Sequence, residues 1–369
     1  MAMHVKALGR SALCLGACAG ALLTVYASPS YAQGVETDDE IVVTASRREE
    51  AVIEAPVAVT AIDVDQAISQ GVTDINALAD FVPGLTATDG GAPGLGNLVV
   101  RGLYAVSGAP STGIYLDDVP IGPVVGGAGN SLALDGSLFD LDRVEVVRGP
   151  QGTLFGSSAM GGVVRYASRQ PSLSETDGFA FADFSNTENG GYNTLLRGRV
   201  SVPIVQDRLA VSLSGFRSDA EGYTDHPLRN LENVDESEFW GGMLTVAADV
   251  TPNFSLRLNA VRQEAEYSAV AAEAFNLTTG QRLLGSRQDV TASPTPRTLE
   301  FELYSLVADY DFGWGTLSSA TSQQTLTFAN QIDLTASFGA FADFLAPAGA
   351  PHRVGFESAF DTERVTQEF

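Results

Sequence analysis

The stretch "FSLRLNAVRQ" (254–263) alternates apolar and polar residues with a period of two. That period indicates a β-strand with one solvent-exposed face, because successive side chains of a strand point to opposite sides. With Val261 as an exception, one face holds Phe254, Leu256, Leu258 and Ala260, and the other holds Ser255, Arg257, Asn259 and Gln263. Strands of this kind are typical of antiparallel sheets.

The same period recurs through most of the region from Pro171 to Phe369. It predicts strands near 178–186, 192–204, 208–222, 238–250, 254–268, 298–312 and 315–332, and the start of an eighth near Glu363. The connections alternate between short ones, near 204–208, 250–254 and 311–315, and long ones, near 222–238, 268–298 and 332–363. Only the 186–192 connection departs from this alternation.

Alternating short and long connections are typical of an outer-membrane β-barrel, which has short turns on one side and long loops on the other. A soluble β-sandwich is the alternative, but its strands usually have about 5–6 residues. Several strands predicted in this chain exceed ten residues, as tilted membrane strands do. The region 172–369 is therefore predicted to form transmembrane β-barrel strands.

The region from about Ala51 to Pro171 has a different pattern and predicts a small mixed α/β domain. "VAVTAID" predicts a strand, and Asp63 with Gln66 forms a loose capping box for a short helix that ends at Gly71. Thr73 is the predicted cap of a second helix that runs through Asp80. Short strands follow at "LVVRGL" (98–103), "GIYLDDVP" (113–120), "DRVEVVRG" (142–149) and "GGVVRYAS" (161–168), with many glycines between them.

The predicted barrel strands are too few to enclose the predicted α/β domain. A compact domain of about 120 residues has a radius of gyration near ~14 Å. An eight-stranded barrel has an interior only wide enough for side chains, whereas barrels of about 22 strands hold a plugged lumen. The chain also stops at "RVTQEF", inside an alternating run. We therefore expect this sequence to be the N-terminal part of a longer protein with an incomplete barrel.

The first 32 residues have the pattern of a secretory signal peptide, with Lys6 and Arg10 before an apolar stretch that is too short to span a bilayer. "SYAQ" predicts cleavage after Ala32. The alternative is a lipoprotein signal at "LGAC" (15–18), but it leaves the apolar residues after Cys18 unexplained.

Composition narrows the class of protein. Cys14 and Cys18 are the only cysteines and lie in the predicted signal, so a mature chain has no disulfide or thiolate chemistry. The formal net charge of −24 argues against a nucleic-acid partner. No later segment has 18 consecutive apolar residues, so no transmembrane helix is predicted.

Four motifs occur in order behind the signal: "EIVVTASRRE" (40–49), "LVVRGL" (98–103), "TGIYLDDVPIG" (112–122) and "LFDLDRVEVVRGPQGTLFGSSAMGGVVRYASRQP" (138–171). Together they resemble the TonB-dependent outer-membrane receptors over most of the mature chain. Asp118 replaces the glycine that is usual in the family's Y-x-D-G-V-P hairpin. The resemblance implies a signal peptide at 1–32, a TonB-box segment at 33–50, an α+β plug domain at 51–171 and the first barrel strands at 172–369.

The resemblance also implies roles for individual residues. The TonB box would be Glu40, Ile41, Val42, Val43, Thr44 and Ala45, and it would bind the periplasmic protein TonB by strand addition. The alternative is that 41–45 forms the first strand of the plug sheet. The segment 33–40 leaves no room for the N-terminal signalling domain of some relatives, so transcriptional signalling is not expected.

Within the plug, the resemblance implies a latch at Arg101, Glu145 and Arg148, whose arginines would pair with barrel carboxylates. Most of those carboxylates are expected beyond Phe369, and Glu368 is the candidate inside the chain. The alternative is that these arginines pair within the plug. The plug motif glycines are Gly102, Gly149, Gly152, Gly156, Gly161 and Gly162.

The implied function is TonB-dependent active import of a scarce solute across the Gram-negative outer membrane, with no cofactor and no resident metal. A ferric siderophore is the leading substrate, on family frequency alone, and saccharides or cobalamin are the alternatives. The substrate-defining parts would be 90–97, 122–136 and the three long loops. An enzyme is not expected, because His226 and His352 are the only histidines after His4 and no lysine remains for a Walker loop. A passive porin would need neither a TonB box nor a plug.

Overall fold

A computed structural model describes residues 42–43, 50–51, 57–72, 75–88, 97–104, 110–121, 140–270, 273, 275–276, 278–335, 338 and 353–369. All of them belong to one compact unit, Ile41–Phe369. The predicted signal peptide, the segment 90–96 and the segment 122–136 lie outside the described residues.

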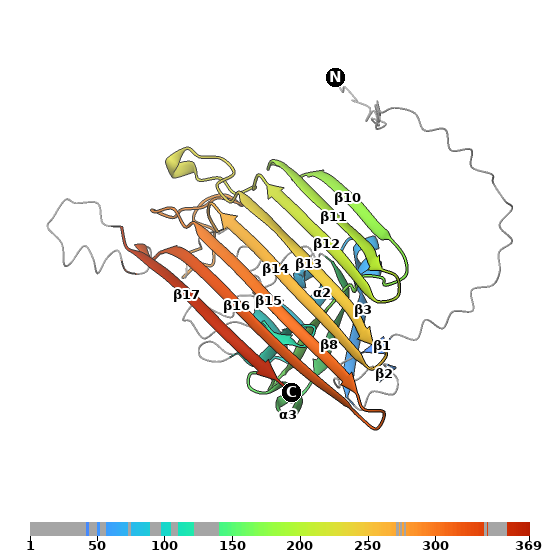
Figure 1. Ribbon diagram of the computed structural model, residues 1–369. Helices are drawn as coiled ribbons and strands as arrows, with labels where there is room; N and C mark the ends of the chain where they lie inside the picture. The colour runs from blue at the N-terminus through green and yellow to red at the C-terminus, as the bar shows by residue number, and fades with distance from the viewer. Residues whose placement is uncertain are drawn as a thin grey trace, which may run out of the picture. The chain divides into compact units, whose positions relative to one another are not determined.

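Eight long antiparallel strands form a single sheet in chain order, which we call the wall (Figure 1). The strands are β10 (Asp177–Asn186), β11 (Tyr192–Val205), β12 (Leu209–Ala220), β13 (Ser237–Thr251), β14 (Phe254–Tyr267), β15 (Arg297–Asp311), β16 (Thr316–Asp333) and β17 (Gly355–Glu368). The strands have between 10 and 18 residues. A sandwich of two facing sheets is therefore excluded for this region, and the prediction of long antiparallel strands is confirmed.

The eighth strand begins earlier than predicted, at Gly355 instead of near Glu363. Its register with β16 pairs Phe356 with Ile332 and Phe360 with Phe328. The rings of Phe328 and Phe360 lie 5.1 Å apart, so apolar cross-strand pairs extend the ladder toward the loop.

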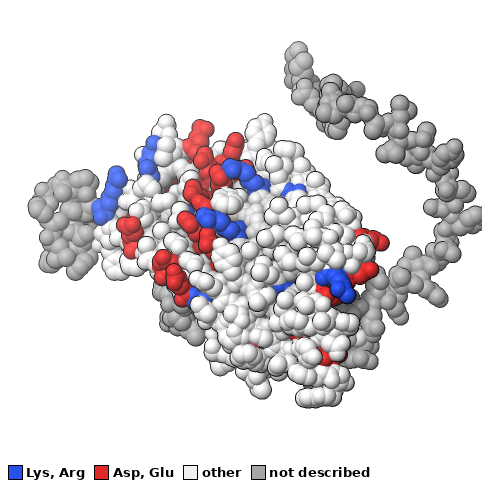
Figure 2. Space-filling view, in the orientation of Figure 1, with Lys and Arg blue, Asp and Glu red and all other residues white. Residues whose placement is uncertain are grey.

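The two faces of the wall differ in polarity. One row crosses the inner face from strand to strand with small polar side chains that are all buried: Ser201, Ser212, Thr245, Asn259, Ser305 and Ser322. The neighbouring row on the outer face is largely apolar and includes the exposed residues Val200, Leu213, Leu244 and Tyr304. Arg and Asp or Glu side chains gather on the outer face toward the long loops (Figure 2), where Arg217 contacts Glu238 and Arg262 contacts Glu302.

The plug centres on a five-stranded sheet in the order β3-β8-β9-β6-β7, in which only the β6–β9 pair is parallel. Its strands are β3 (Ala58–Asp63), β6 (Thr112–Leu116), β7 (Val119–Pro120), β8 (Leu141–Arg148) and β9 (Gly162–Ser168). The strands β4 (Leu85–Thr88) and β5 (Asn97–Val100) form a separate pair. The helices are α1 (Val64–Ser69), α2 (Ile75–Ala79) and α3 (Gly152–Phe155).

Local sequence signals explain most of these boundaries. Asp63 caps α1, as predicted, because its Oδ1 accepts from the Gln66 N–H at 2.7 Å, and Gly71 follows the helix with φ of +86°. The predicted strand 98–103 ends at Val100, since Arg101 takes a positive φ of 56° and turns the chain. The predicted strand 113–120 is two strands, since Asp117 turns the chain with φ of 51°.

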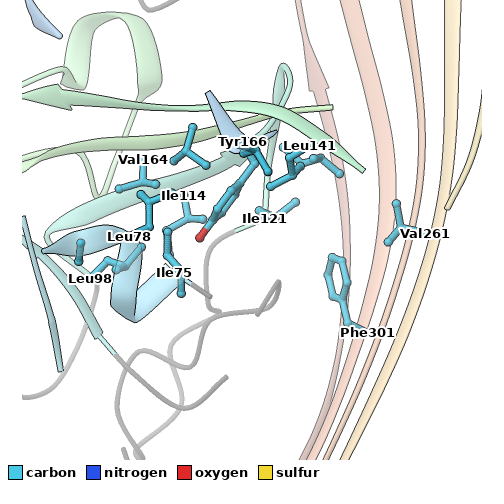
Figure 3. Close-up of a cluster of buried hydrophobic side chains, with 14 of the residues drawn as sticks. Ile75, Leu78, Leu98, Ile114, Ile121, Leu141, Val164, Tyr166, Val261 and Phe301 are labelled. Atoms are coloured by element: carbon cyan, nitrogen blue, oxygen red, sulfur yellow. The ribbon is translucent and has the colours of Figure 1, made fainter. Parts of the chain in front are cut away.

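The core joins the plug to the wall. Buried plug residues form one cluster that includes Ile75, Leu78, Ile114 and Val164. In Figure 3 these side chains lie on one side, and Val261 and Phe301 come from the strands of the wall on the other. Phe301 is 1% exposed, so its burial depends on the plug and the wall together.

We predict that Gly162→Ala destabilises the plug by about 1–3 kcal/mol, the cost of overpacking a filled site. A Cβ at this position would lie 2.2 Å from the carbonyl oxygen of Val147, which is backbone of the paired strand. Thermal unfolding of the purified receptor measures the change. Gly152→Ala is the matched control, because a Cβ there meets nothing within 4 Å. Equal unfolding temperatures for the two variants would contradict the prediction.

Candidate plug latch and coupling strand

The plug touches the wall through the tight turn between β6 and β7. The hairpin pairs Leu116 with Val119, so Asp117 and Asp118 form its two-residue turn. Asp117 adopts the left-handed conformation, which Asp tolerates better than most residues with a Cβ. The turn therefore presents two adjacent carboxylates.

The Asp117 carboxylate is 4% exposed and satisfied on both oxygens. Oδ1 accepts from the Ser168 N–H at 2.9 Å, and Oδ2 accepts from the Ser168 hydroxyl at 2.7 Å. Oδ2 also accepts from Nδ2 of Asn259 at 3.1 Å, and Asn259 lies on β14 of the wall. Asp117 thus joins β9 of the plug to the wall through one buried group.

Asp118 forms the ionic half of the same contact. Its Oδ2 lies 2.8 Å from Nη2 of Arg257, also on β14, and its Oδ1 lies 3.6 Å from Nη2 of Arg165 on β9. Arg165 also donates from Nε to the carbonyl oxygen of Asp117 at 2.7 Å. We call Asp117, Asp118, Arg165, Arg257 and Asn259 the latch.

Electrostatics keep the latch ionised. Burial alone would raise the pKa of Asp117, but the nearby Arg257 and Arg165 and the hydrogen bonds from Ser168 outweigh it, so the pKa falls below the ordinary value of 3.8. Folding therefore favours the charged form of Asp117. The contribution to stability is present above that ordinary pKa and is lost as the pH falls through the lower, folded pKa.

A second contact between the plug and the wall involves the residue just before β8. Asp140, next to β8, is 2.8 Å from Nε of Arg199 on β11, and Arg199 also contacts Asp177 and donates to the Gln170 carbonyl oxygen at 3.1 Å. Burial raises the pKa of Asp140, and the Ser214 hydroxyl and Arg199 offset this only in part. The ionised form of Asp140 lowers the stability of the fold, whereas the ionised form of Asp117 in the latch raises it.

A third contact uses plug backbone. The carbonyl oxygen of Pro120 accepts from Nε2 of Gln324 at 3.0 Å and from Nη2 of Arg364 at 2.7 Å. These two side chains also bind each other at 2.9 Å. In all three contacts the plug supplies oxygen acceptors and the wall supplies nitrogen donors.

The residues predicted as the latch lie elsewhere. Glu145 is fully buried, and its Oε1 is 2.8 Å from Nε of Arg143 and 3.4 Å from Nη1 of Arg165, both in the plug. Arg148 donates to the Pro83 carbonyl oxygen at 3.3 Å, and Arg101 is exposed beside Gly149. Glu368 lies on β17 opposite Ala320. Pairing of Arg101 and Arg148 with barrel carboxylates stays a prediction.

Features of the sequence pointed to the latch contacts, although they were not predicted. Asp118 departs from the glycine of the family pattern, and an extra charge at a tight turn needs a partner. Arg257 and Asn259 lie on the polar face of the strand 254–263, two residues apart, so they point to the same side. Sequence pattern identified the polar face but not what it touches.

The coupling strand is only partly described. Among the residues of the predicted TonB box, Glu40, Ile41, Thr44 and Ala45 lie outside the described part. The strand β1 (Val42–Val43) pairs with β2 (Glu50–Ala51) in a two-stranded sheet. Since the five-stranded sheet does not include β1, the alternative that this segment is the first strand of the plug sheet is wrong for the described residues.

Val43 is 1% exposed and packs in a second cluster, which contains Val59, Tyr115, Val147, Phe155, Ala159 and Val163. Neighbouring residues of the same strands, such as Val146 and Val164, belong to the cluster shared with the wall. Side chains of a strand alternate between faces. The plug sheet therefore has Val43 on one face and the wall-facing core on the other.

Among the described residues, no three His, Cys, Asp or Glu side chains form a group able to hold a metal ion. No helix in this part of the chain is long and apolar enough to cross a membrane.

Comparison with known proteins agrees with this architecture. Residues 51–163 match the TonB-dependent Receptor Plug Domain family. This match identifies residues 51–163 as a TonB-dependent receptor plug domain. The open form of the ferric-catecholate import receptor Fiu from E. coli K12 has a similar fold, with a TM-score of 0.62 at 16% identity over 86% of this chain and 46% of that one. The unliganded ferric citrate transporter FecA gives 0.61 at 15% identity, over 76% and 43%.

Several curated relatives are receptors with iron-related names. A hemin receptor from Yersinia enterocolitica is 30% identical over 203 residues, which is 54% of this chain and 26% of the relative. A ferrioxamine B receptor from Salmonella typhimurium is 29% identical over 177 residues, or 46% and 24%. The chain thus spans about a quarter of the length of these relatives.

We predict that Asp117→Asn destabilises the plug by about 1–3 kcal/mol near neutral pH, because it leaves Arg257 and Arg165 near a neutral group. The difference from wild type should shrink as the pH falls through the folded pKa of Asp117, where wild type loses the same charge. Thermal unfolding of the detergent-solubilised receptor at about pH 7 and about pH 3 checks both statements.

Asp142→Asn is the control for this experiment, since the Asp142 side chain is half exposed and forms a salt bridge with Arg143 within the plug. It should shift unfolding by less than about 0.5 kcal/mol. A loss for Asp117→Asn that grows toward acid pH would contradict the assignment of an ionised Asp117.

Proposed function

We propose that this chain is part of a receptor that imports an iron-containing solute across the outer membrane, powered by TonB. The observation that carries the proposal is a plug bound to the wall through buried polar contacts and bearing a short strand on its opposite face. A passive pore has no use for either feature. The iron-related names of the relatives favour a ferric siderophore or another iron chelate over a saccharide or cobalamin.

The proposed location rests on the polarity of the wall. A transmembrane strand has apolar residues toward lipid and polar residues toward the interior, which is the opposite of a soluble sheet. The wall follows this order at the level of the latch, with exposed Leu213 and Tyr304 outside and buried Ser212 and Ser305 inside. Secretion by a signal peptide cleaved after Ala32 completes the proposal.

Coupling would use the segment 40–45 as a strand for TonB. Strand addition needs free backbone groups along one edge. In the described conformation Val43 pairs with Glu50 and is buried, so a partner strand has to replace β2 or add to the other edge of β1. The pair β1–β2 has only two residues in each strand. Replacing it with a longer intermolecular ladder therefore costs little free energy.

We predict that Val43→Pro in the full-length receptor abolishes energised uptake and leaves binding of the iron chelate at the cell surface nearly unchanged. Proline removes the backbone donor that strand addition needs. Val43→Thr keeps the donor and the β-branched shape and should retain most of the uptake. Separate assays of binding and uptake of a radiolabelled ferric siderophore in whole cells measure both properties.

Glu50→Pro is the matched variant on the other side of the β1–β2 pair. It should weaken the internal pairing and leave 40–45 intact, so uptake persists. Uptake lost equally in Val43→Pro and Glu50→Pro would mean that the pair itself matters, and normal uptake by Val43→Pro would exclude this segment as the coupling strand.

A further inference from the structure

Tyr115 lies on β6, two residues before the latch turn, and is 4% exposed. Its neighbours Ile114 and Leu116 belong to the cluster shared with the wall, whereas Tyr115 belongs to the cluster that buries Val43. Alternation of side chains along the strand explains the difference. Tyr115 therefore lies on the face of the plug sheet that carries β1.

The Tyr115 side chain ties α3 to this face. Its hydroxyl donates to the carbonyl oxygen of Phe155 at 2.6 Å. Phe155 is the last residue of α3, and the last carbonyl groups of a helix have no partner within the helix. The two rings also meet edge to face, with centroids 5.0 Å apart and an interplanar angle of 74°. One side chain thus supplies both a hydrogen bond and an aromatic contact.

Gly113 provides the space for the Tyr115 ring. A Cβ at this position would lie 3.4 Å from Cε2 of Tyr115, 3.4 Å from Cγ2 of Val163 and 3.7 Å from Cβ of Ala159. The ring therefore lies over Gly113, beside Val163 of the sheet and Ala159 of the segment that contains α3. Close packing on these sides leaves the ring little freedom to turn away from α3.

The segment 149–161 forms one side of the cluster that buries Val43. It is closed by two backbone bonds of 2.8 Å, from the Gln151 N–H to the Ala159 carbonyl oxygen and from the Gly149 N–H to the Gly161 carbonyl oxygen. Phe155 and Ala159 lie in the cluster with Val43. Since β1 and β2 pair over only two residues each, the burial of Val43 in this cluster is what mainly holds β1 in place.

The other side of the same hairpin is bound to the wall. Tyr115 pairs with Pro120, whose carbonyl oxygen accepts from Gln324 and Arg364 of the wall. Asp117, two residues after Tyr115, accepts from Asn259 of the wall. The hairpin 112–120 therefore carries wall contacts at its turn and Tyr115 in the cluster of Val43.

We propose that Tyr115 is a positioning residue for the coupling strand. Its hydroxyl holds α3 over the sheet, α3 keeps Val43 buried, and a displacement of the β6–β7 hairpin from the wall loosens both. The role in coupling rests on the proposed function of the segment 40–45 as the strand for TonB. The role in burying β1 rests only on the contacts of Tyr115, Phe155 and Val43.

Hydrogen–deuterium exchange of the full-length receptor in detergent, followed on peptides that cover 41–51, tests the first step. Tyr115→Phe keeps the ring and removes the hydrogen bond to Phe155, so exchange in 41–51 should become about fivefold faster. Peptides from β15 are the internal reference and should keep their exchange rate. An unchanged rate in 41–51, or an equal acceleration in β15, would overturn the proposal.

Tyr166→Phe is the matched control, because Tyr166 is a buried tyrosine of the same sheet in the cluster shared with the wall. It should leave exchange in 41–51 unchanged, and an acceleration equal to that of Tyr115→Phe would contradict a specific role of Tyr115.

A double-mutant cycle with Asp117→Asn tests the connection to the wall. Asp117→Asn should accelerate exchange in 41–51 in the presence of Tyr115 and do so less in Tyr115→Phe, since the connecting hydrogen bond is then already absent. Equal accelerations in the two backgrounds would show that the latch and β1 are independent, against the proposal.

Binding of the TonB periplasmic domain to the same receptor without solute separates the two roles. If β1 is the coupling strand, the affinity for TonB should rise by the same factor of about five in Tyr115→Phe, because the accessible fraction of β1 is larger. Faster exchange with no gain in TonB affinity would overturn the assignment of 40–45 as the coupling strand and leave the role of Tyr115 in burying β1 intact.

Discussion

A buried carboxylate stays ionised only where the protein replaces the water that it has lost, and at Asp117 the plug and the wall do this together. Ser168 supplies two donors from the plug, and Asn259 supplies one from the wall. Arg257 and Arg165 supply the charge that holds the pKa of Asp117 low. Neither region alone satisfies the turn, so the position of the plug follows from the chemistry of one carboxylate.

The inner face of the wall suits this arrangement because its side chains are small and polar at the level of the latch. An apolar inner face would bind the plug only through the apolar area that it buries. Phe301 and Val261 contact the plug in this way in the core cluster. A polar face binds through a few directional contacts, each of which exchanges with water at modest cost. Contacts of this kind hold a plug in one place and still allow it to be released, as the proposed import function would require.

The plug sheet lies between its two attachments. Val43 packs with Val147 and Val163 on one face, and their neighbours Val146 and Val164 face the cluster that includes Phe301. The strand β1 therefore packs against strands that also carry the wall-facing core. Arg165 of β9 contacts the latch turn directly, so the same strand connects both attachments.

Period-two alternation was enough to predict the wall, because a strand's side chains alternate whatever it pairs with. Asp63, Gln66 and Gly71 determined the first helix in the same local way. The partners of Arg257 and Asn259 could not be predicted, since they lie about 140 residues earlier, on the turn between β6 and β7. Glu145 was expected to help latch the plug because of the family resemblance, and only the packed sheet brings Arg165 and Arg143 beside it. Patterns along the chain record which face a residue occupies. Which residues meet across two faces depends on how the chain packs in three dimensions.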